Sequence, residues 1–399
     1  MNSQELMAIE DQYGARNYRP LDVVVDRGEG VWLYDTEGRR YLDCLSAYSA
    51  VNQGHCHPRI VKVMREQAGR LTLTSRAFRN SQLGLFEQDL CELGGYEMAL
   101  PMNTGSEAVE TALKAARRWG YQVKGVPADQ AEIIACVGNF HGRTISIISM
   151  SSEVKYTQGF GPLTPGFRLV PFGDAEALEA CITDNTVAFL VEPIQGEGGV
   201  IIPPDGYLRA AAALCERYHI LFMVDEIQTG LGRAGHLFAH QAEGVRPDVV
   251  MVGKALSGGL YPVSAVLADR PVLGLFGPGD HGSTFGGNPL AAAVAREALR
   301  VLVDERLSDR SMEMGSYFLG RLARLESSLV REVRGRGLMI GVELQDHAGG
   351  GRRYCEALAG RGLLCKETRG NVIRLTPPLV ITRNEIDWAV EQVAAVLEA

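Results

Sequence analysis

The sequence has no long hydrophobic run and no excess of basic residues. None of its apolar runs approaches the roughly 18 residues that a membrane-spanning helix needs, so no membrane association is expected. The 48 acidic residues outnumber the 40 basic ones and give a formal charge of −8. Because nucleic-acid binding needs a basic face, this balance argues against nucleic acid as the main partner. A local basic pocket for an anionic substrate remains compatible with it.

The eight cysteines are scattered, and no Cys-x-x-Cys pair occurs among them. Neither a zinc site nor a disulfide framework is therefore predicted. His55-Cys56-His57 resembles a metal-binding cluster, but it directly precedes Pro58, and we interpret it as structural with no metal bound. The first twenty residues lack the apolar core of a signal peptide. Reduced thiols and the missing signal predict a cytoplasmic protein.

The middle of the 399-residue chain alternates short Val- and Ile-rich runs with longer helical patterns. A chain of this length is expected to form two domains. Continuous apolar strands interleaved with helices indicate an α/β fold whose mostly parallel sheet is covered on both faces. The predicted buried strands are residues 133–137, 187–191, 220–224, 249–252 and 263–267.

The two ends of the chain differ from the middle in their pattern of predicted strands and helices. Two short runs flank Thr36-Glu37-Gly38, as in a β-hairpin. After about residue 288 come a long helical stretch, short strands and a final helix over 384–398. We therefore expect a large central domain and a smaller domain built from both termini. The expected ranges are 1–52 and 291–399 for the small domain and 53–290 for the large one.

A lysine follows one of the predicted strands, in Val249-Val250-Met251-Val252-Gly253-Lys254. Open α/β sheets bind ligands at the carboxyl ends of their strands. Partial desolvation at such a place lowers the pKa of a lysine and makes its amine nucleophilic. A strand-end lysine is by itself more often a surface residue that extends its charge into water. The lysine therefore becomes informative only in combination with other features.

Two further motifs supply that combination. Asp225 ends the strand before Lys254, and a carboxylate there is costly without a cationic partner such as a protonated pyridine nitrogen. The alternative is that Asp225 caps the following helix. Thr104-Gly105-Ser106-Glu107 fits a capping box at a helix start, where free N–H groups bind anions. A well-capped helix without a ligand is the commoner case, but the three features together are much more specific.

With these motifs in place, the chain resembles the class III pyridoxal-phosphate aminotransferases of fold type I. The resemblance extends from about Tyr13 to the C-terminal helix, and the spacing of Asp225 and Lys254 fits the family pattern. It implies a large domain with a mostly parallel seven-stranded sheet, a small α+β domain from both termini, and a homodimer. The stretches that carry it are residues 13–18, 45–55, 71–78, 191–197, 253–262 and 281–289.

The resemblance implies how pyridoxal phosphate would be held. Lys254 would form a Schiff base with the cofactor and then act as the acid and base of the proton shift. Asp225 would pair with the pyridine nitrogen, and Gln228 would contact the ring oxygen. The other implied contacts are to the phosphate from Gly105 and Ser106, to the ring face from Phe140, and to the phosphate of the neighbouring subunit's cofactor from Ser283 and Thr284.

Within the family, the resemblance is greatest to members that act on ornithine, which implies transfer of the δ-amine of L-ornithine to 2-oxoglutarate. Arginine forks bind carboxylates well, and Arg143 and Arg374 are the candidates. The resemblance implies that Glu197 covers Arg374 until 2-oxoglutarate binds, although a purely structural ion pair is the alternative. It also implies that Tyr18 binds the α-amino group of ornithine and that Tyr48 restricts bulk beside the cofactor.

Other activities remain open from the sequence. N-acetylornithine, lysine and 4-aminobutyrate are rival amino donors for the same site. An aminomutase or racemase of this fold would not need 2-oxoglutarate, and a cofactor-sensing regulator would need a DNA-binding domain, whereas about a dozen residues precede Tyr13. Two positions depart from the animal members that act on ornithine, which carry an apolar residue at Ser106 and Trp at His141. We expect His141 to alter the pocket wall near Arg143.

Overall fold

The Val- and Ile-rich runs of the central chain form a seven-stranded sheet within residues 1–398, the part of the chain that the computed structural model describes. The five strands β5 to β9 pair in parallel, and β10 is antiparallel to both of its neighbours. The predicted α/β fold with a mostly parallel seven-stranded sheet is therefore confirmed. In spatial order the strands are β4 (Met98–Met102), β10 (Ser264–Ala268), β9 (Val249–Val252), β8 (Leu221–Asp225), β7 (Thr186–Val191), β5 (Glu132–Cys136) and β6 (Phe167–Val170).

The five predicted strands are the inner ones, and the two that the sequence analysis did not predict, β4 and β6, lie at the edges of this sheet. Edge strands need not be continuously apolar, because neighbours cover them less completely. β4 contains Pro101, which an edge strand tolerates, and β6 contains Arg168. Because of these residues, neither strand appears in the sequence as a continuous Val- and Ile-rich run.

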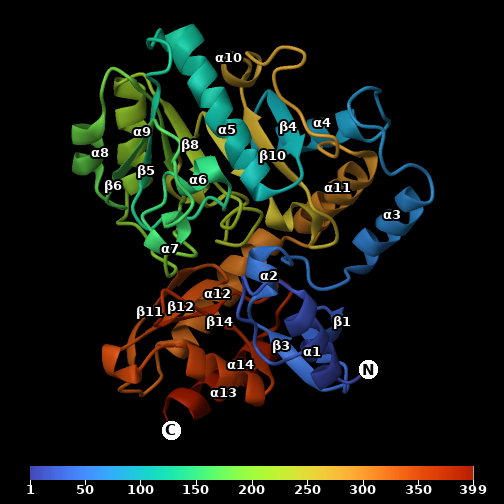
Figure 1. The fold of residues 1–399 in the computed structure, drawn as a ribbon. Helices are drawn as coiled ribbons and strands as arrows, with labels where there is room; N and C mark the ends of the chain where they lie inside the picture. Colours follow the sequence, from blue (N-terminus) through green and yellow to red (C-terminus); the bar gives the residue numbers. More distant parts are fainter. Residues whose placement is uncertain (399) are drawn as a thin grey trace.

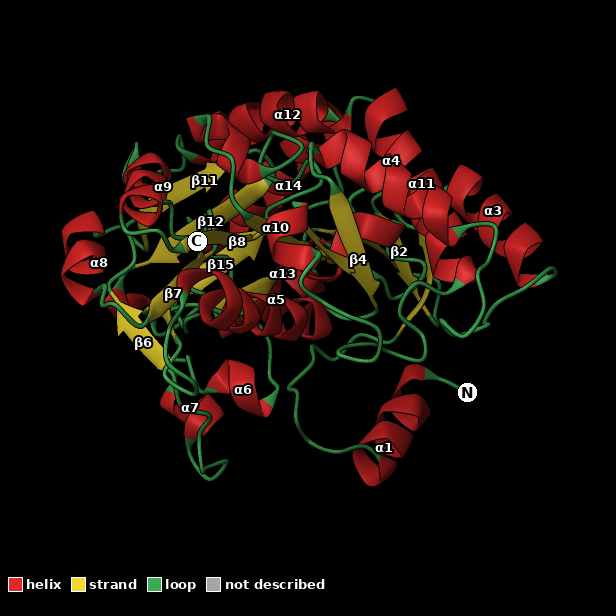
Figure 2. Ribbon diagram, turned by 90° about the horizontal axis from the view of Figure 1, so that it is seen from above, coloured by secondary structure: helices red, strands yellow, loops and turns green. Residues whose placement is uncertain are grey.

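Helices cover both faces of the sheet, which explains the continuous apolar pattern of its strands. Along β5, Ile133 packs in the cluster of α5 (Gly105–Trp119), whereas Ile134 packs in the cluster of α9 (Tyr207–Arg217). Figure 2 shows the strands between α5 on one side and α9, α4 (Leu83–Gly94) and α11 (Pro289–Asp304) on the other. The carboxyl ends of the parallel strands are left free to carry a site.

Below this layered body lie the N-terminal and C-terminal segments of the chain (Figure 1). The predicted hairpin is β2 and β3, and the C-terminal strand β13 joins it by pairing in parallel with β3. The expected domain boundaries at residues 52 and 290 remain a prediction. The two sheets of this lower part are β1 (Val25–Glu29), β2 (Trp32–Asp35), β3 (Arg40–Asp43) and β13 (Leu363–Leu364), and β11 (Val330–Arg336), β12 (Met339–Leu344), β15 (Val372–Leu375) and β14 (Lys366–Thr368).

The predicted C-terminal helix is α14 (Arg383–Leu397), one residue off the expected range. No helix within residues 1–398 is both long enough and apolar enough to cross a membrane. The remaining helices are α1 (Ser3–Tyr13), α2 (Ser46–Ser49), α3 (Pro58–Ala68), α6 (Ile145–Ile148), α7 (Val154–Thr157), α8 (Ala175–Cys181), α10 (Arg270–Leu273), α12 (Leu307–Leu322) and α13 (Arg352–Gly360).

The two histidines of the His55-Cys56-His57 motif pair with carboxylates. His55 Nε2 lies 2.7 Å from Asp43 Oδ2, and His57 Nε2 lies 3.0 Å from Glu305 Oε1. The pairs connect the segment after β3 to β3 itself and to the end of α11. These contacts give both histidines a structural role.

Candidate active site

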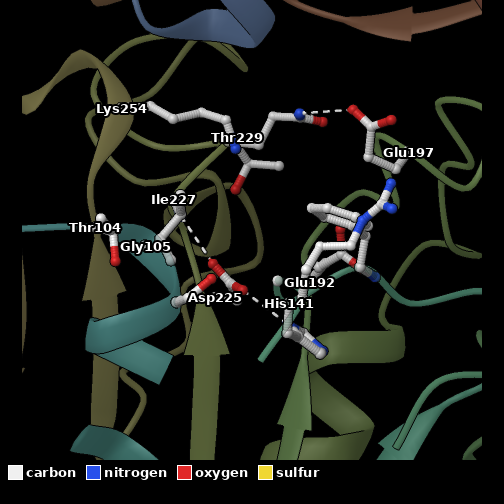
Figure 3. A pocket seen from close by; sticks show the side chains of 14 residues that line it. Thr104, Gly105, His141, Glu192, Glu197, Asp225, Ile227, Thr229 and Lys254 are labelled. Carbon is white, nitrogen blue, oxygen red and sulfur yellow. Dashed lines mark hydrogen bonds and ion pairs between the residues drawn. The ribbon is translucent and has the colours of Figure 1, made fainter. Parts of the chain in front are cut away.

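A pocket of about 280 Å³ lies beside the carboxyl ends of β8 and β9 (Figure 3). Eight of the predicted site residues line it: Gly105, Ser106, Phe140, Arg143, Glu197, Asp225, Gln228 and Lys254. Four other lining residues were not predicted from the sequence: Gly142, Glu192, Ile227 and Thr229. His141 was expected at the pocket wall, but its contact with Asp225 was not predicted. The topology of the sheet thus brings together residues that are up to about 150 positions apart in the chain.

Lys254 lies two residues after β9, with its backbone in the left-handed region at a φ of 45°. Non-glycine residues adopt this conformation at a cost and do so mainly where a site requires it. Burial lowers the pKa of the Lys254 ammonium, although the negative charges of Asp225 and Glu197 partly oppose this shift. The neutral amine is the nucleophilic form, so the surroundings activate this lysine.

Asp225 is held at the pocket floor by two hydrogen bonds. Its Oδ1 accepts the N–H of Ile227 at 3.0 Å, and its Oδ2 lies 2.7 Å from Nδ1 of the buried His141. Burial alone would lower the pKa of His141, but the hydrogen bond and charge of Asp225 raise it overall. The sequence predicted only that His141 alters the pocket wall near Arg143. Its contact with Asp225 goes beyond that prediction. Through its ring nitrogen Nδ1, His141 orients the Asp225 carboxylate at the pocket floor.

A second buried carboxylate, Glu192, lies close to this pair. Its Oε2 accepts the N–H of Phe140 at 3.0 Å, and burial raises its pKa to about 8 even though His141 opposes the shift. Glu192 is thus mainly protonated at neutral pH. Asp225 was predicted as a site residue because it is a carboxylate at the end of an apolar strand. The same pattern applies to Glu192, which directly follows Val191, the last residue of β7.

The start of α5 forms an anion cradle. Thr104 Oγ1 accepts the N–H of Glu107 at 3.2 Å, and Glu107 Oε2 accepts the N–H of Thr104 at 2.8 Å, which confirms the predicted capping box. The N–H groups of Gly105 and Ser106 in the first turn have no partner within the helix and are available to an anion. A Cβ atom on Gly142 would lie 2.3 Å from Ser106 Oγ, so a larger residue there would displace the cradle.

Gln228 completes the wall that faces Lys254 and Glu197. Its Nε2 donates to Glu197 Oε1 at 3.4 Å, whereas its buried Oε1 has no hydrogen-bond partner in the described part of the chain. A Cβ atom on Gly196 would lie 1.5 Å from that oxygen, so glycine is required beside it. An unpartnered acceptor, a strand-end carboxylate, an anion cradle and a buried lysine with a lowered pKa together fit pyridoxal phosphate. We call Gly105, Ser106, Asp225, Gln228 and Lys254 the cofactor end.

Glu197 also contacts Arg374, the buried arginine of β15. Arg374 Nη1 donates to Glu197 Oε1 at 2.6 Å, and the Arg374 guanidinium carbon lies 5.0 Å from the centre of the Tyr48 ring. Burial pushes the pKa of Glu197 upward, but Arg374 offsets this effect and leaves the pKa lowered. The Glu197 carbonyl oxygen accepts a hydrogen bond from Thr368 Oγ1 at 2.6 Å. We call Tyr48, Glu197 and Arg374 the substrate end.

Tyr48 lies on a left-handed turn. All four residues of α2, Ser46 to Ser49, have φ values between 45° and 71°. For L-residues this conformation costs roughly 1–2 kcal/mol each, so the surroundings must hold it in place. Asp43 Oδ1 accepts the N–H groups of Leu45 and Ser46 at 2.8 Å each, and Ser46 Oγ donates to the carbonyl of Thr376, just after β15.

The other predicted residues lie farther from this pocket or face outward. Arg143 lines the pocket but is exposed, with its guanidinium carbon 4.0 Å from the centre of the Tyr156 ring. Tyr18 is 72% exposed. Ser283 and the exposed Thr284 line a separate cavity of about 650 Å³. The structure therefore places these four residues at the rim or outside the pocket.

The cofactor end, with its activated lysine, defines a site for pyridoxal-phosphate chemistry, and the comparisons agree. The profile of the aminotransferase class III family matches residues 13–397. The chain belongs to this family and is a pyridoxal-phosphate-dependent aminotransferase.

Its relatives are more specific. The chain is 62% identical to an ornithine aminotransferase of Bordetella pertussis over 98% of its own length and 94% of that protein. The solved structure of an ornithine aminotransferase from Toxoplasma gondii, described with partial occupancy of PLP at the active site, aligns with a TM-score of 0.98 at 45% identity, covering 100% of this chain and 94% of that one. An acetylornithine aminotransferase from Elizabethkingia anophelis aligns with a TM-score of 0.91 at 47% identity, covering 100% of this chain and 99% of that one.

Proposed function

We propose that this enzyme transfers the δ-amino group of L-ornithine to 2-oxoglutarate, which yields glutamate 5-semialdehyde, and hence pyrroline-5-carboxylate, together with glutamate. The observation that carries the proposal is the substrate end, where Glu197 neutralises the buried Arg374 beneath the Tyr48 ring. The high identity to proteins named ornithine aminotransferase over almost their full lengths supports the same conclusion.

The cofactor end fits the first part of the reaction. Bound pyridoxal phosphate supplies the electrophilic carbon that accepts the substrate's amine and an electron-withdrawing ring. Gly105 and Ser106 would hold its phosphate, Asp225 its ring nitrogen and Gln228 its ring oxygen, with Phe140 against the ring face. Lys254 then moves the proton at the carbon that bears the reacting amine, a role that its lowered pKa favours.

The substrate end determines which end of each substrate faces the cofactor. Ornithine carries an α-amino acid end that must stay away from the cofactor, whereas glutamate must later present that same end to it. With Glu197 on Arg374, the free arginine for the carboxylate of ornithine is Arg143, and Tyr18 would bind its α-amino group. When 2-oxoglutarate binds, Glu197 moves aside and both arginines hold the diacid through charge-assisted hydrogen bonds.

We further propose that the enzyme is a cytoplasmic homodimer that links arginine breakdown to proline synthesis. Ser283 and Thr284 lie outside the pocket of their own chain and line a cavity with Arg76 and His281. Ser283 Oγ accepts a hydrogen bond from Asn103 Nδ2 at 2.9 Å, which fixes the loop. A second copy whose phosphate site reaches this loop would use both hydroxyl groups.

A panel of amino donors tests the proposal. The purified enzyme is assayed with ornithine, N-acetylornithine, lysine and 4-aminobutyrate, each with and without 2-oxoglutarate, while pyrroline-5-carboxylate is trapped chemically. Ornithine is expected to give the highest kcat/KM, and turnover should require 2-oxoglutarate. Faster turnover of N-acetylornithine would refute the assignment, and turnover without 2-oxoglutarate would indicate an aminomutase or racemase.

A further inference from the structure

Arg233 is a fully buried cation without a carboxylate partner. No ion pair of the described residues includes it, and its guanidinium is bonded instead to neutral oxygens. Nη1 donates to the carbonyls of Leu338 at 2.8 Å and Pro377 at 2.6 Å. Nη2 donates to Ser46 Oγ at 3.2 Å and Asn52 Oδ1 at 2.6 Å. Burial lowers the pKa of Arg233 to about 9, although the negative charge of Asp43 partly opposes this shift, so burying this cation costs free energy.

Three of the four acceptors belong to segments that meet at the substrate end, and the fourth, the Leu338 carbonyl, directly precedes β12. Ser46 opens the left-handed turn that carries Tyr48, and Asn52 lies just beyond that turn. Pro377 follows β15, the strand of Arg374. Arg233 itself lies in the loop after β8, eight residues beyond Asp225. A single guanidinium therefore connects the loop after β8 to the Tyr48 turn and to the segment after β15.

The left-handed turn needs such a restraint, because its four residues all have unfavourable φ values. Ser46 Oγ is the point where the restraints converge, since it accepts from Arg233 and donates to the Thr376 carbonyl. Asn52 closes the arrangement by donating from Nδ2 to the carbonyl of Leu231 at 2.9 Å, two residues before Arg233. The position of Tyr48 relative to Lys254 thus depends on these hydrogen bonds.

We propose that Arg233 is a positioning residue that fixes the Tyr48 turn relative to the cofactor end and thereby sets which amino donor the site accepts. It acts through Tyr48 and does not touch the substrate. The proposal rests on the proposed ornithine activity, because Tyr48 is the residue that limits bulk beside the reacting amine. Lysine cannot replace Arg233, since a single ammonium lacks the planar fork that reaches four acceptors in fixed directions.

The test uses the holoenzyme and two readouts. Arg233→Lys and Ser46→Ala are compared with Arg310→Lys, a matched control whose guanidinium also binds backbone carbonyls, those of Leu379, Val380 and Ile381, but does not touch the turn. Hydrogen exchange of residues 44–52 should accelerate in the first two variants and not in the control. The ratio of kcat/KM for ornithine to that for N-acetylornithine should fall by about tenfold, the effect of one lost buried hydrogen bond.

Combination with Tyr48→Ala separates positioning from general destabilisation. If Arg233 acts through Tyr48, then Arg233→Lys adds no further loss of donor selectivity to Tyr48→Ala. The proposal would be overturned if the losses of donor selectivity in the two single variants multiplied in the double variant. It would also be overturned if hydrogen exchange of residues 44–52 were unchanged in folded Arg233→Lys. If Arg233→Lys does not fold, Ser46→Ala decides by the same readouts. A wild-type enzyme that prefers N-acetylornithine would refute the ornithine activity, while the exchange measurement would still decide whether Arg233 holds the turn.

Discussion

The cofactor end, which lines the pocket, and the substrate end, which reaches it through Glu197, are built in different ways. The cofactor end consists of short sequence motifs that lie at strand ends or begin a helix, such as Asp225 at the end of β8 and Gly105 at the start of α5. The substrate end joins Tyr48, Glu197 and Arg374, which come from the N-terminal segment, the central domain and β15. The sheet topology positions the first, whereas contacts between distant segments position the second. Changes at the two ends should therefore differ in kind as well as in size.

The largest loss of activity is expected for Lys254→Ala at the cofactor end. This change removes the group proposed to move the substrate proton, so turnover of every amino donor should fall by roughly 10²–10⁴-fold or more. Borohydride reduction followed by mass spectrometry should no longer find the cofactor bound to the peptide that contains residue 254. The exposed Lys62 provides the control, and Lys62→Ala should retain both properties. Residual turnover near the wild-type level would show that another residue moves the proton.

Asp225→Asn should impair all donors equally, since a neutral amide cannot stabilise a charged ring nitrogen. The expected loss in kcat is roughly 100-fold, the usual effect of one preorganised electrostatic contact. Steady-state kinetics with ornithine and with glutamate as donors measure it. A loss confined to one donor would contradict the view that the cofactor end serves both half-reactions.

Much of the cofactor end and little of the substrate end could be predicted from residue patterns alone. Inner strands are apolar except at their ends, so Asp225 and Lys254 stand out where the apolar runs stop. The same rule applied to β7 would have identified Glu192. In contrast, Ser46, Ala47 and Tyr48 carry no sign of a left-handed turn, because that conformation is typical of glycine and is imposed here by tertiary hydrogen bonds.

The substrate end itself is tested by Glu197→Ala. Arg374 then loses its partner and becomes free to bind α-carboxylates, so kcat/KM should rise for glutamate and fall for ornithine. The ratio of the two is expected to change by roughly 10- to 200-fold, the range of a single specificity contact. Glu153→Ala is the matched control, because Glu153 pairs with Arg369 away from the pocket lining. An unchanged ratio would support a purely structural Glu197–Arg374 pair.

The last prediction concerns the stability of the fold and not turnover. Glu192 ionises near pH 4.5 in an unfolded chain and at about 8 in the folded protein. Because the unfolded chain ionises first, the contribution of Glu192 is fully present below pH 4.5 and is lost as the pH rises to about 8, by on the order of 1 kcal/mol per pH unit. Glu192→Gln keeps an acceptor for Phe140 N–H and removes this dependence. Urea unfolding from pH 5 to 8 should show a flatter pH profile than the wild type, and parallel profiles would exclude the raised pKa.

The hydrogen bond from Thr368 to the backbone of Glu197 has a consequence for the timing of the reaction. Because Thr368 Oγ1 holds the Glu197 carbonyl at 2.6 Å, the carboxylate can leave Arg374 by side-chain rotation while its backbone stays in place. Side-chain rotations are complete within nanoseconds to microseconds in most settings, whereas domain movements take microseconds to milliseconds. With turnover numbers of roughly 1–1,000 per second, alternation between the two substrates would never limit the rate. The enzyme would then change its substrate specificity twice in every cycle by rotation of the Glu197 side chain, without a domain movement.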